Sequence, residues 1–504
     1  MNPGTTRLLL ATALAAGLLG GCDSTAGPEP AAAATRHYGR IAFEPCTLAT
    51  GVSAGNVQAY CARFEVPEDR SAPEGRKIAL SLAWLPATDE GSATDDPVFF
   101  FAGGPGQSAL KTWPQVDPAF AQVRKQRHVI LVDQRGTGGS NPLECAPPEG
   151  ADAAAGGADP AVLAAFAARC AAEVADRADP RFYTTAGAVA DVEAVREAIG
   201  AAKIDLVGVS YGTRVAQQYA GAHPQAVRSL VLDGVAPNDL VVGGEFAHTF
   251  EDALKLQSEH CRQLPSCAAR FPQDARTQLA GLVERLRQAP AEVEYRDPSS
   301  AQSRRGTVSA DTVTGLAFMF SYMPQTASLL PLVLDEASQG RYAPLLSLHD
   351  LMGRNMGGSM ARGMQWSVIC AEDADRYQEN EAAAGTLLGP EVARMFFAAC
   401  PSWPHGGRAE GFTTPLRSEV PALLLSGELD PVTPPRYGEQ VAQGLANGRH
   451  LVLKGQGHGN LGSGCMPRLV AQFLESADAK ALDAACLDTL AYVPPFTSFN
   501  GWEP

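Results

Sequence analysis

The 504 residues are 45% hydrophobic and 19% charged, a composition typical of a globular protein that buries a core. The formal net charge is −15 and no basic run occurs, which excludes nucleic-acid binding as the general function because phosphate contacts need clustered Lys and Arg. The length exceeds that of one compact domain, so we expect a core domain with a substantial insertion.

The first 22 residues have the pattern of an export signal. Arg7 precedes an apolar stretch over residues 8–19, which is too short to span a bilayer. Leu19-Gly20-Gly21-Cys22 resembles the bacterial lipobox, in which cleavage leaves the cysteine as an acylated N-terminus. We expect an exported protein held at a bacterial membrane through lipid on Cys22, with an ordinary secretory signal as the alternative. Residues 23–36, rich in Ala, Pro and Gly, are expected to form a flexible tether.

Ten cysteines remain once Cys22 is set aside for lipidation. An even set in an oxidising compartment suggests disulfides, and pairing neighbours along the chain gives the shortest loops. The chain has no CxxC pair, so zinc binding is not favoured. We therefore predict disulfides among Cys46, Cys61, Cys145, Cys170, Cys261, Cys267, Cys370, Cys400, Cys465 and Cys486.

Short apolar runs bounded by turn residues predict buried strands along the core of the chain. Helix-like segments over residues 188–199 and 213–222 lie between some of these runs, and this alternation predicts an α/β fold with a mostly parallel sheet. The runs are residues 78–84, 98–101, 128–132, 204–209, 230–232, 422–425 and 451–453.

The alternation stops between about residues 236 and 416, where helical patterns dominate, for example over 246–256, 277–286 and 329–336. We predict that residues 37–235 form the first part of the core and residues 417–504 the second. Residues 236–416 would then be a mostly helical cap inserted over the carboxyl edge of the sheet, where open α/β sheets bind ligands.

Gly208-Val209-Ser210-Tyr211-Gly212 directly follows a predicted strand and precedes a predicted helix. This is the setting of a nucleophile elbow, in which small residues on either side allow a tight turn that exposes the serine. A serine hydroxyl needs a neighbouring imidazole to accept its proton. Ser210 is therefore the predicted nucleophile.

The base and its orienting acid are sought at later strand ends. His458 follows the strand over 451–453, whereas His450 begins that strand and is expected to be structural. Asp430 follows the strand over 422–425 and completes the chain order serine, acid, histidine of this fold. Glu428 is the alternative acid, and Thr433 is a residue that could hold Asp430 by a hydrogen bond.

The oxyanion of the reaction needs preorganised backbone N–H donors. One is expected from Tyr211, the residue after the nucleophile, and the second from the glycine-rich loop after the strand over 98–101. We predict Gly104 as the second donor, because its backbone can approach a substrate closely.

These motifs together resemble the prolyl iminopeptidase and tripeptidyl aminopeptidase group of α/β-hydrolases. The resemblance rests on Gly103-Gly104-Pro105-Gly106, Asp133-Gln134-Arg135-Gly136, the elbow, Asp430 and His458, and on Cys370 followed by Cys400-Pro401-Ser402-Trp403-Pro404, which is similar to secreted tripeptidyl aminopeptidases. Ala102 departs from the histidine of many iminopeptidases and loosens the assignment of single-proline removal.

The resemblance implies action at the free amino terminus of peptide substrates, and hence carboxylates that face the substrate ammonium. Glu372 and Asp373 are the candidates for this role, while Arg135 is expected to be structural.

The leading hypothesis is a serine aminopeptidase that releases short peptides, in particular tripeptides, and needs no cofactor or metal. Prolyl iminopeptidase activity, or a carboxylesterase or lipase with the same triad, are the alternatives, and a non-catalytic binding protein is a third class.

Overall fold

The computed structural model describes residues 34–49, 55–146, 159–357 and 360–502. The predicted signal, the lipid attachment residue Cys22 and most of the predicted tether lie outside these residues. In the described part of the chain, no helix is both long and apolar enough to cross a membrane.

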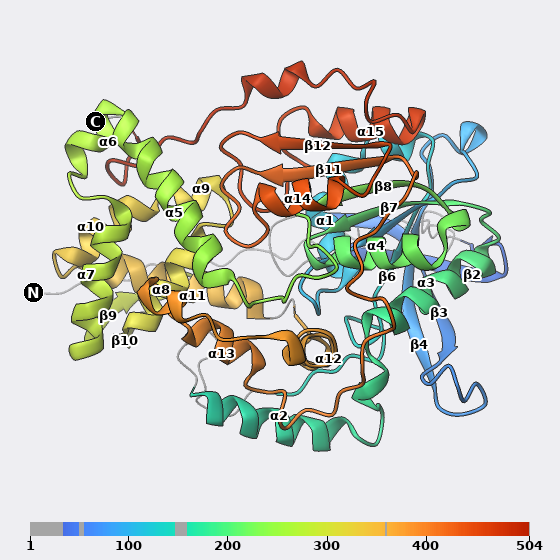
Figure 1. Cartoon of the computed structure of the whole chain (residues 1–504), viewed down its shortest axis with the longest axis horizontal. Coiled ribbons are helices and arrows are strands. Elements are labelled where there is room, and N and C mark those ends of the chain that lie inside the picture. The colour runs from blue at the N-terminus through green and yellow to red at the C-terminus, as the bar shows by residue number, and fades with distance from the viewer. Residues whose placement is uncertain (1–33, 50–54, 147–158, 358–359, 503–504) are drawn as a thin grey trace, which may run out of the picture. The chain divides into compact units, whose positions relative to one another are not determined.

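A ten-stranded sheet organises the residues on both sides of the insertion (Figure 1). Its central strands are buried on both faces, which is why their sequences are nearly continuous apolar runs. The strand order is β1 (Arg36–Tyr38), β2 (Ile41–Ala49), β3 (Asn56–Pro67), β4 (Lys77–Leu85), β6 (Val129–Val132), β5 (Val98–Phe101), β7 (Ile204–Val209), β8 (Val227–Asp233), β11 (Ala422–Gly427) and β12 (Gly448–Leu453).

The six strands from β6 to β12 in that order are parallel, so their carboxyl ends share one edge. The strands β1 to β4 are antiparallel and extend the sheet on one side. The strand order within the sheet places the ends of β7, β8, β11 and β12 next to one another. This edge therefore collects residues that are far apart in the sequence.

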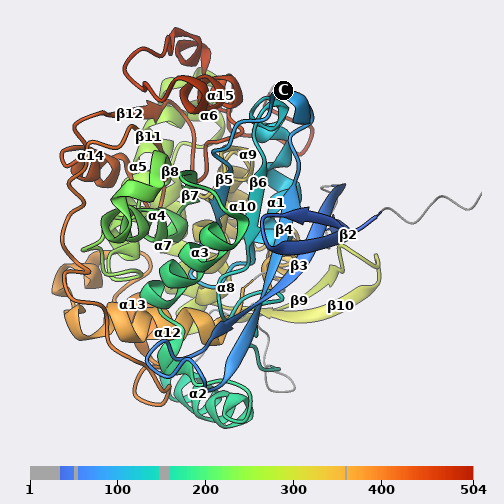
Figure 2. The same ribbon diagram turned by 90° about the vertical axis from the view of Figure 1, so that its right-hand side faces the viewer.

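Helices cover both faces of the sheet. One face packs against α3 (Thr185–Ile199), α4 (Tyr211–Ala222) and α14 (Pro435–Ala442), and the other against α1 (Ala109–Val116) and α15 (Met466–Ser476). Figure 2 shows α3 and α4 on one side of the strands and α1 on the other. The α3 helix begins where the Thr184 side chain accepts a hydrogen bond from Gly187 N–H, and it ends at Gly200 in the left-handed conformation.

The first part of the insertion has a hydrophobic core of its own, to which Phe250, Leu279 and Leu316 contribute. Its elements lie together on the left of Figure 1. They are α5 (Phe246–Gln263), α6 (Pro265–Arg270), α7 (Ala275–Gln288), β9 (Ala291–Arg296), β10 (Ser303–Val308), α8 (Ala310–Phe320), α9 (Pro324–Ala327), α10 (Leu330–Ser338) and α11 (Ala343–Gly357). The β9–β10 hairpin is an addition to the helical pattern expected there.

The second part of the insertion packs differently from the first. The helix α12 (Arg362–Glu372) buries Trp366 and Ile369 in the main core, where Trp366 contacts Trp403 and Phe166 of α2 (Pro160–Val174). After α12 comes α13 (Glu391–Phe397). Residues 236–416 are therefore not one uniform cap, because α12 belongs to the packing of the sheet domain.

The described cysteines form five disulfides, each between neighbours in the predicted set. Each disulfide closes a short loop of the chain. Disulfides form and persist in oxidising compartments. The pairs are Cys46–Cys61, Cys145–Cys170, Cys261–Cys267, Cys370–Cys400 and Cys465–Cys486. This pairing favours an extracytoplasmic location.

Candidate active site

Ser210 occupies the turn between β7 and α4. Its backbone has φ 57° and ψ −127°, a conformation that L residues rarely adopt and that marks a strained functional turn. Glycine is required on both sides, since a Cβ at Gly208 would lie 2.4 Å from Gly212 O and one at Gly212 would lie 2.3 Å from Phe101 O. The structure thus has the tight elbow that the motif predicts.

Asp430 and His458 meet at the carboxyl edge of β11 and β12. The carboxylate Oδ2 lies 2.7 Å from His458 Nδ1, and both side chains are shielded from solvent. The Asp430 carboxylate accepts hydrogen bonds from the backbone N–H groups of Val432 and Thr433, at 2.9 and 2.8 Å, and from the Thr433 hydroxyl at 2.8 Å. Because Nδ1 faces the carboxylate, Nε2 is the nitrogen left for the nucleophile.

Burial and the ion pair act in opposite directions on both groups. Burial alone would lower the pKa of His458, but the adjacent Asp430 carboxylate outweighs it and raises that pKa above its usual value. Burial would raise the pKa of Asp430, but the imidazole and the hydrogen bonds lower it. The pair therefore stabilises the imidazolium that forms when serine loses its proton.

The two rival residues have other partners. His450 Nε2 lies 2.9 Å from Ser426 Oγ, within the sheet. Glu428 accepts hydrogen bonds from Gly455 N–H at 2.8 Å and from the Tyr492 hydroxyl at 3.0 Å. Both residues support neighbouring segments, in keeping with a structural role.

Asp233, at the end of β8, joins the elbow to the histidine loop and was not singled out from the sequence. Its backbone oxygen accepts the Ser210 N–H at 2.8 Å. Its buried carboxylate accepts the N–H groups of Asn460 and Leu461 at 2.5 and 2.9 Å. One residue thus holds the nucleophile turn and the segment just after His458. The only signal in the sequence was a carboxylate at the end of a strand.

The cap reaches the base through Tyr322, between α8 and α9. The backbone N–H of His458 donates to the backbone carbonyl oxygen of Tyr322 at 2.7 Å. The two aromatic rings also pack edge to face, with their centroids 5.4 Å apart. A Cβ at Gly457 would lie only 2.2 Å from the same carbonyl oxygen. The position of the base therefore depends on the cap as well as on the sheet.

The glycine-rich loop after β5 lies directly against the nucleophile. A Cβ at Gly103 would be 2.9 Å from Ser210 Cβ, and Gly104 has φ +110°. Tyr211 begins α4, as an oxyanion donor after the elbow should. Among the described residues the Ser210 hydroxyl makes no hydrogen bond to His458, and such contacts are often looser before substrate binds. The oxyanion roles of Gly104 and Tyr211 stay predictions.

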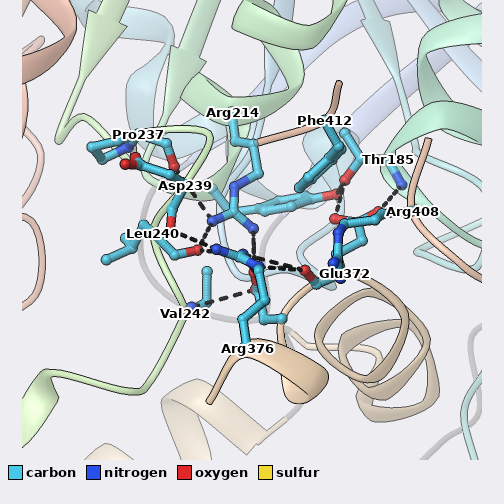
Figure 3. Close-up of polar contacts among 12 residues, drawn as sticks. Thr185, Arg214, Pro237, Asp239, Leu240, Val242, Glu372, Arg376, Arg408 and Phe412 are labelled. Atoms are coloured by element: carbon cyan, nitrogen blue, oxygen red, sulfur yellow. Dashed lines mark hydrogen bonds and ion pairs between the residues drawn. The ribbon is translucent and has the colours of Figure 1, made fainter. Parts of the chain in front are cut away.

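We expected Glu372 and Asp373 to face the ammonium group of the substrate, but in the structure both side chains are buried and bind groups of the protein itself (Figure 3). They are only 1% and 0% exposed. Glu372 accepts the Thr185 N–H and hydroxyl at 2.7 and 2.8 Å, and Asp373 pairs with Arg214 at 3.1 Å and Arg376 at 2.5 Å. Both carboxylates have internal partners because the end of α12 is packed into the main core.

The Figure 3 cluster instead ties the start of the insertion to the elbow helix. Arg214, on α4, also donates to the backbone oxygens of Pro237 and Leu240, which follow β8. Burial of Glu372 raises its pKa to about 7. Thr185 Oγ1, which contacts this carboxylate, is 2.6 Å from the Tyr211 hydroxyl. These contacts fix the backbone around the nucleophile.

Arg135 has the structural role expected of it. Its guanidinium binds the Asp191 carboxylate through two contacts of 2.7 and 2.6 Å, and it also donates to the backbone oxygens of Glu68 and Phe182. It is 1% exposed and joins loops beside the sheet.

A family model described as alpha/beta hydrolase fold matches residues 96–464. Serine protease Hip1 of Mycobacterium tuberculosis (strain ATCC 25618 / H37Rv) is 27% identical over 520 residues, covering 95% of this chain and 97% of the relative. Tripeptidyl aminopeptidase of Streptomyces lividans is 29% identical over 187 residues, 35% of each protein. Proline iminopeptidase of Mycobacterium smegmatis, a solved structure, has 18% identity and a TM-score of 0.38 over 84% of this chain and 100% of its own.

The family match covers more than half of the chain and includes the elbow, Asp430 and His458. This protein belongs to the α/β-hydrolase fold family and is a serine hydrolase whose matched relatives include peptidases.

Proposed function

We propose that this serine hydrolase is an aminopeptidase that releases short peptides, in particular tripeptides, from the free amino terminus of peptide substrates. The observation that carries the hydrolytic part of the proposal is the buried Asp430–His458 pair, whose loop is joined to the Ser210 elbow through Asp233. The names of the Streptomyces and Mycobacterium relatives support peptide substrates over other acyl compounds.

In this mechanism the Ser210 hydroxyl attacks the scissile carbonyl while His458 accepts its proton. The carbonyl electrons move to oxygen, where the N–H groups of Tyr211 and Gly104 stabilise the negative charge. The C–N bond then breaks, and His458 gives its proton to the departing amine. Water, deprotonated by the same imidazole, attacks the acyl-enzyme and releases the short peptide, which restores the Ser210 hydroxyl.

The test compares a tripeptidyl 4-nitroanilide with a free amine, its N-acetylated form, prolyl 4-nitroanilide and 4-nitrophenyl butyrate. We expect the free tripeptide to be the best substrate. Acetylation should lower kcat/KM about 30-fold or more, since it removes a charged contact of about 2 kcal/mol. An unchanged rate after acetylation contradicts the exopeptidase assignment, and faster ester cleavage favours the carboxylesterase alternative.

Ser210→Ala should lower kcat about 10⁵-fold to 10⁶-fold on every substrate that is cleaved. The matched control is Ser476→Ala, at the end of α15 and outside the site, where the exposed hydroxyl donates to Gln472 O and accepts from the Asp478 N–H. Activity retained by Ser210→Ala would show that another residue is the nucleophile.

We further propose that the protein acts outside the cytoplasm and is lipid-anchored through Cys22. The five disulfides support export. The full precursor should incorporate labelled palmitate in a bacterial host, and Cys22→Ala should abolish the label. Incorporation that persists in the variant contradicts the anchor, and a wild-type chain that is secreted without label favours the ordinary signal.

A further inference from the structure

A chain of hydrogen bonds joins the end of α12 to the residue that follows the nucleophile. Glu372 Oε1 accepts the Thr185 N–H at 2.7 Å, and Glu372 Oε2 accepts the Thr185 hydroxyl at 2.8 Å (Figure 3). Thr185 Oγ1 is in turn 2.6 Å from the Tyr211 hydroxyl. All three residues are at most 2% exposed. A buried carboxylate that the catalytic steps do not use is thus connected to the residue proposed to supply an oxyanion N–H.

The number of hydrogens in this chain fixes the direction of its bonds. An ionised carboxylate can only accept, so the Thr185 hydroxyl donates its single hydrogen to Glu372. Within the described residues, Thr185 Oγ1 is the one hydrogen-bond partner of the Tyr211 hydroxyl. The Tyr211 hydroxyl therefore donates to Thr185. With Glu372 ionised, every polar hydrogen of the chain has an acceptor.

Protonation of Glu372 upsets this order. Because Oε1 accepts the Thr185 N–H, the acid hydrogen belongs on Oε2, where it donates to Thr185 Oγ1. The Thr185 hydroxyl then turns its own hydrogen toward Tyr211, and the hydrogen of the Tyr211 hydroxyl loses its acceptor. An unpaired buried donor is costly, so the Tyr211 ring has to shift. Only the carboxylate form holds Tyr211 in place.

The charges around Glu372 place its ionisation near neutral pH. Burial raises its pKa to about 7, while Arg214 favours the carboxylate and the charge of Asp373 opposes it. Arg214 and Arg376 are both paired with Asp373. The carboxylate is therefore present above this pKa and is lost as the pH falls through it. The groups facing Glu372 are Thr185 at the start of α3, Tyr211 and Arg214 on α4, and Asp373 and Arg376 at and after the end of α12.

We propose that Glu372 is a positioning residue for the oxyanion hole, whose carboxylate form acts through Thr185 to hold Tyr211 where its backbone N–H meets the oxyanion. The Tyr211 nitrogen is bonded to the carbonyl carbon of Ser210, so a shifted Tyr211 moves the donor relative to the nucleophile. This role rests on the oxyanion function proposed for Tyr211. The oxyanion exists only during the reaction, so the neutral form of Glu372 lowers kcat and leaves KM unchanged.

The first experiment compares Glu372→Gln with wild type across pH, on the chromogenic substrate that wild type cleaves fastest. The amide accepts the Thr185 N–H and donates to Thr185 Oγ1, so it reproduces the neutral acid at every pH. At about pH 9, kcat should be about tenfold below wild type with KM unchanged, and at about pH 5.5 the two kcat values should converge. A ratio of kcat values that does not vary with pH overturns the proposal.

A double-mutant cycle tests the hydrogen-bond chain itself. Tyr211→Phe removes the hydrogen that loses its acceptor, so in that background Glu372→Gln should lower kcat less than about twofold. Equal losses in both backgrounds contradict the chain. Thr185→Val should lower kcat about tenfold, and the conservative Thr185→Ser should recover most of that loss.

The matched control is Glu379→Gln, because Glu379 is an exposed carboxylate paired with Arg394. It should keep the wild-type kcat at every pH. Thermal unfolding of each variant shows that it is folded. A loss in Glu379→Gln equal to that in Glu372→Gln would mean that the effect comes from the overall charge and would overturn the proposal.

A second measurement needs no peptide or ester substrate. Diisopropyl fluorophosphate reacts with the Ser210 hydroxyl, fluoride leaves, and the phosphoryl oxygen occupies the oxyanion hole. The rate constant of labelling should be about tenfold lower in Glu372→Gln at about pH 9 and equal to that of wild type at about pH 5.5. Wild-type labelling by Glu372→Gln at the higher pH overturns the proposal. A preference for esters contradicts the aminopeptidase assignment alone and does not alter this result.

Discussion

The charge on Asp430 sets the pH at which His458 can act as a base. The carboxylate raises the pKa of the imidazole above its usual value. The base works only when neutral, so kcat/KM should rise with pH through this raised pKa. Asp430→Asn should move the acidic limb to lower pH and reduce kcat about 10³-fold to 10⁴-fold. The pH profile of kcat/KM measures both effects.

Glu428→Gln is the matched control for this prediction, because Glu428 is the nearby carboxylate whose partners are Gly455 and Tyr492 instead of the base. Its acidic limb should stay where the wild type has it. If Asp430→Asn left the limb in place and Glu428→Gln moved it, the acid would have been assigned to the wrong residue.

Asp233 should act on the rate through the position of His458. The Asp233 carboxylate accepts two backbone N–H groups, whereas the side-chain amide of Asp233→Asn has only one oxygen acceptor and an NH₂ donor. The substitution should lower kcat about tenfold with little change in KM. The Asp233 carboxylate also raises the pKa of His458, so the acidic limb should move to lower pH.

The comparison variant is Asp239→Asn, six residues further on, where the exposed carboxylate contacts Gln440. This substitution should change neither kcat nor the position of the acidic limb of the pH profile of kcat/KM. A purely structural role for Asp233 would lower the stability of the protein without moving the pH profile.

At the scale of elements, the contact between the cap and the histidine loop leaves no room for a side chain. Gly457→Ala places a Cβ about 2.2 Å from Tyr322 O, so the loop and the α8–α9 connection must separate. We expect a loss of about 1–3 kcal/mol in the free energy of unfolding and a lower kcat. Chemical denaturation and steady-state kinetics measure the two effects.

Gly462→Ala, in the same loop, is the control, because a Cβ there has nothing within 4 Å. It should resemble the wild type in both measurements. Equal behaviour of the two variants would show that the Tyr322 contact does not position the base.

Catalytic residues that belong to a local sequence pattern could be predicted, whereas residues whose role depends on tertiary packing could not. The elbow, Asp430 and His458 were predictable because each lies in the turn or loop that follows a recognisable strand, and the parallel strand ends share one edge. The role of Asp233 was not predicted, because its hydrogen-bond partners, Ser210 and Asn460, come from other parts of the chain. Glu372 and Asp373 were misjudged because nothing in their local sequence shows that α12 packs into the main core.

The same limit applies to the elements themselves. The continuous apolar runs of β5, β7 and β11 were recognisable as buried strands. The antiparallel strands β2 and β3 were not predicted, because exposed and buried residues alternate irregularly along them. The β9–β10 hairpin was missed for a similar reason, since β9 and β10 are mostly exposed and β10 carries a glycine.

At the scale of the whole molecule, disulfides close loops of very different length. Cys370–Cys400 spans 30 residues and joins α12 to the segment after α13, whereas Cys261–Cys267 spans 6 residues within the cap. Loop-closure entropy gives the long bridge about 3–4 kcal/mol and the short one about 2 kcal/mol. Replacing both cysteines of the long bridge by serine should therefore lower Tm more than the same change in the short bridge.

The long bridge should also affect catalysis, because Glu372 and Asp373 directly follow its first cysteine and hold Thr185 and Arg214 near the elbow. Cys370→Ser with Cys400→Ser should reduce kcat at temperatures where the protein is still folded, and Cys261→Ser with Cys267→Ser should leave kcat near the wild-type value. Differential scanning calorimetry and kinetics on both double variants test this difference. Equal losses of Tm and kcat in the two variants would mean that α12 does not link the bridge to the nucleophile.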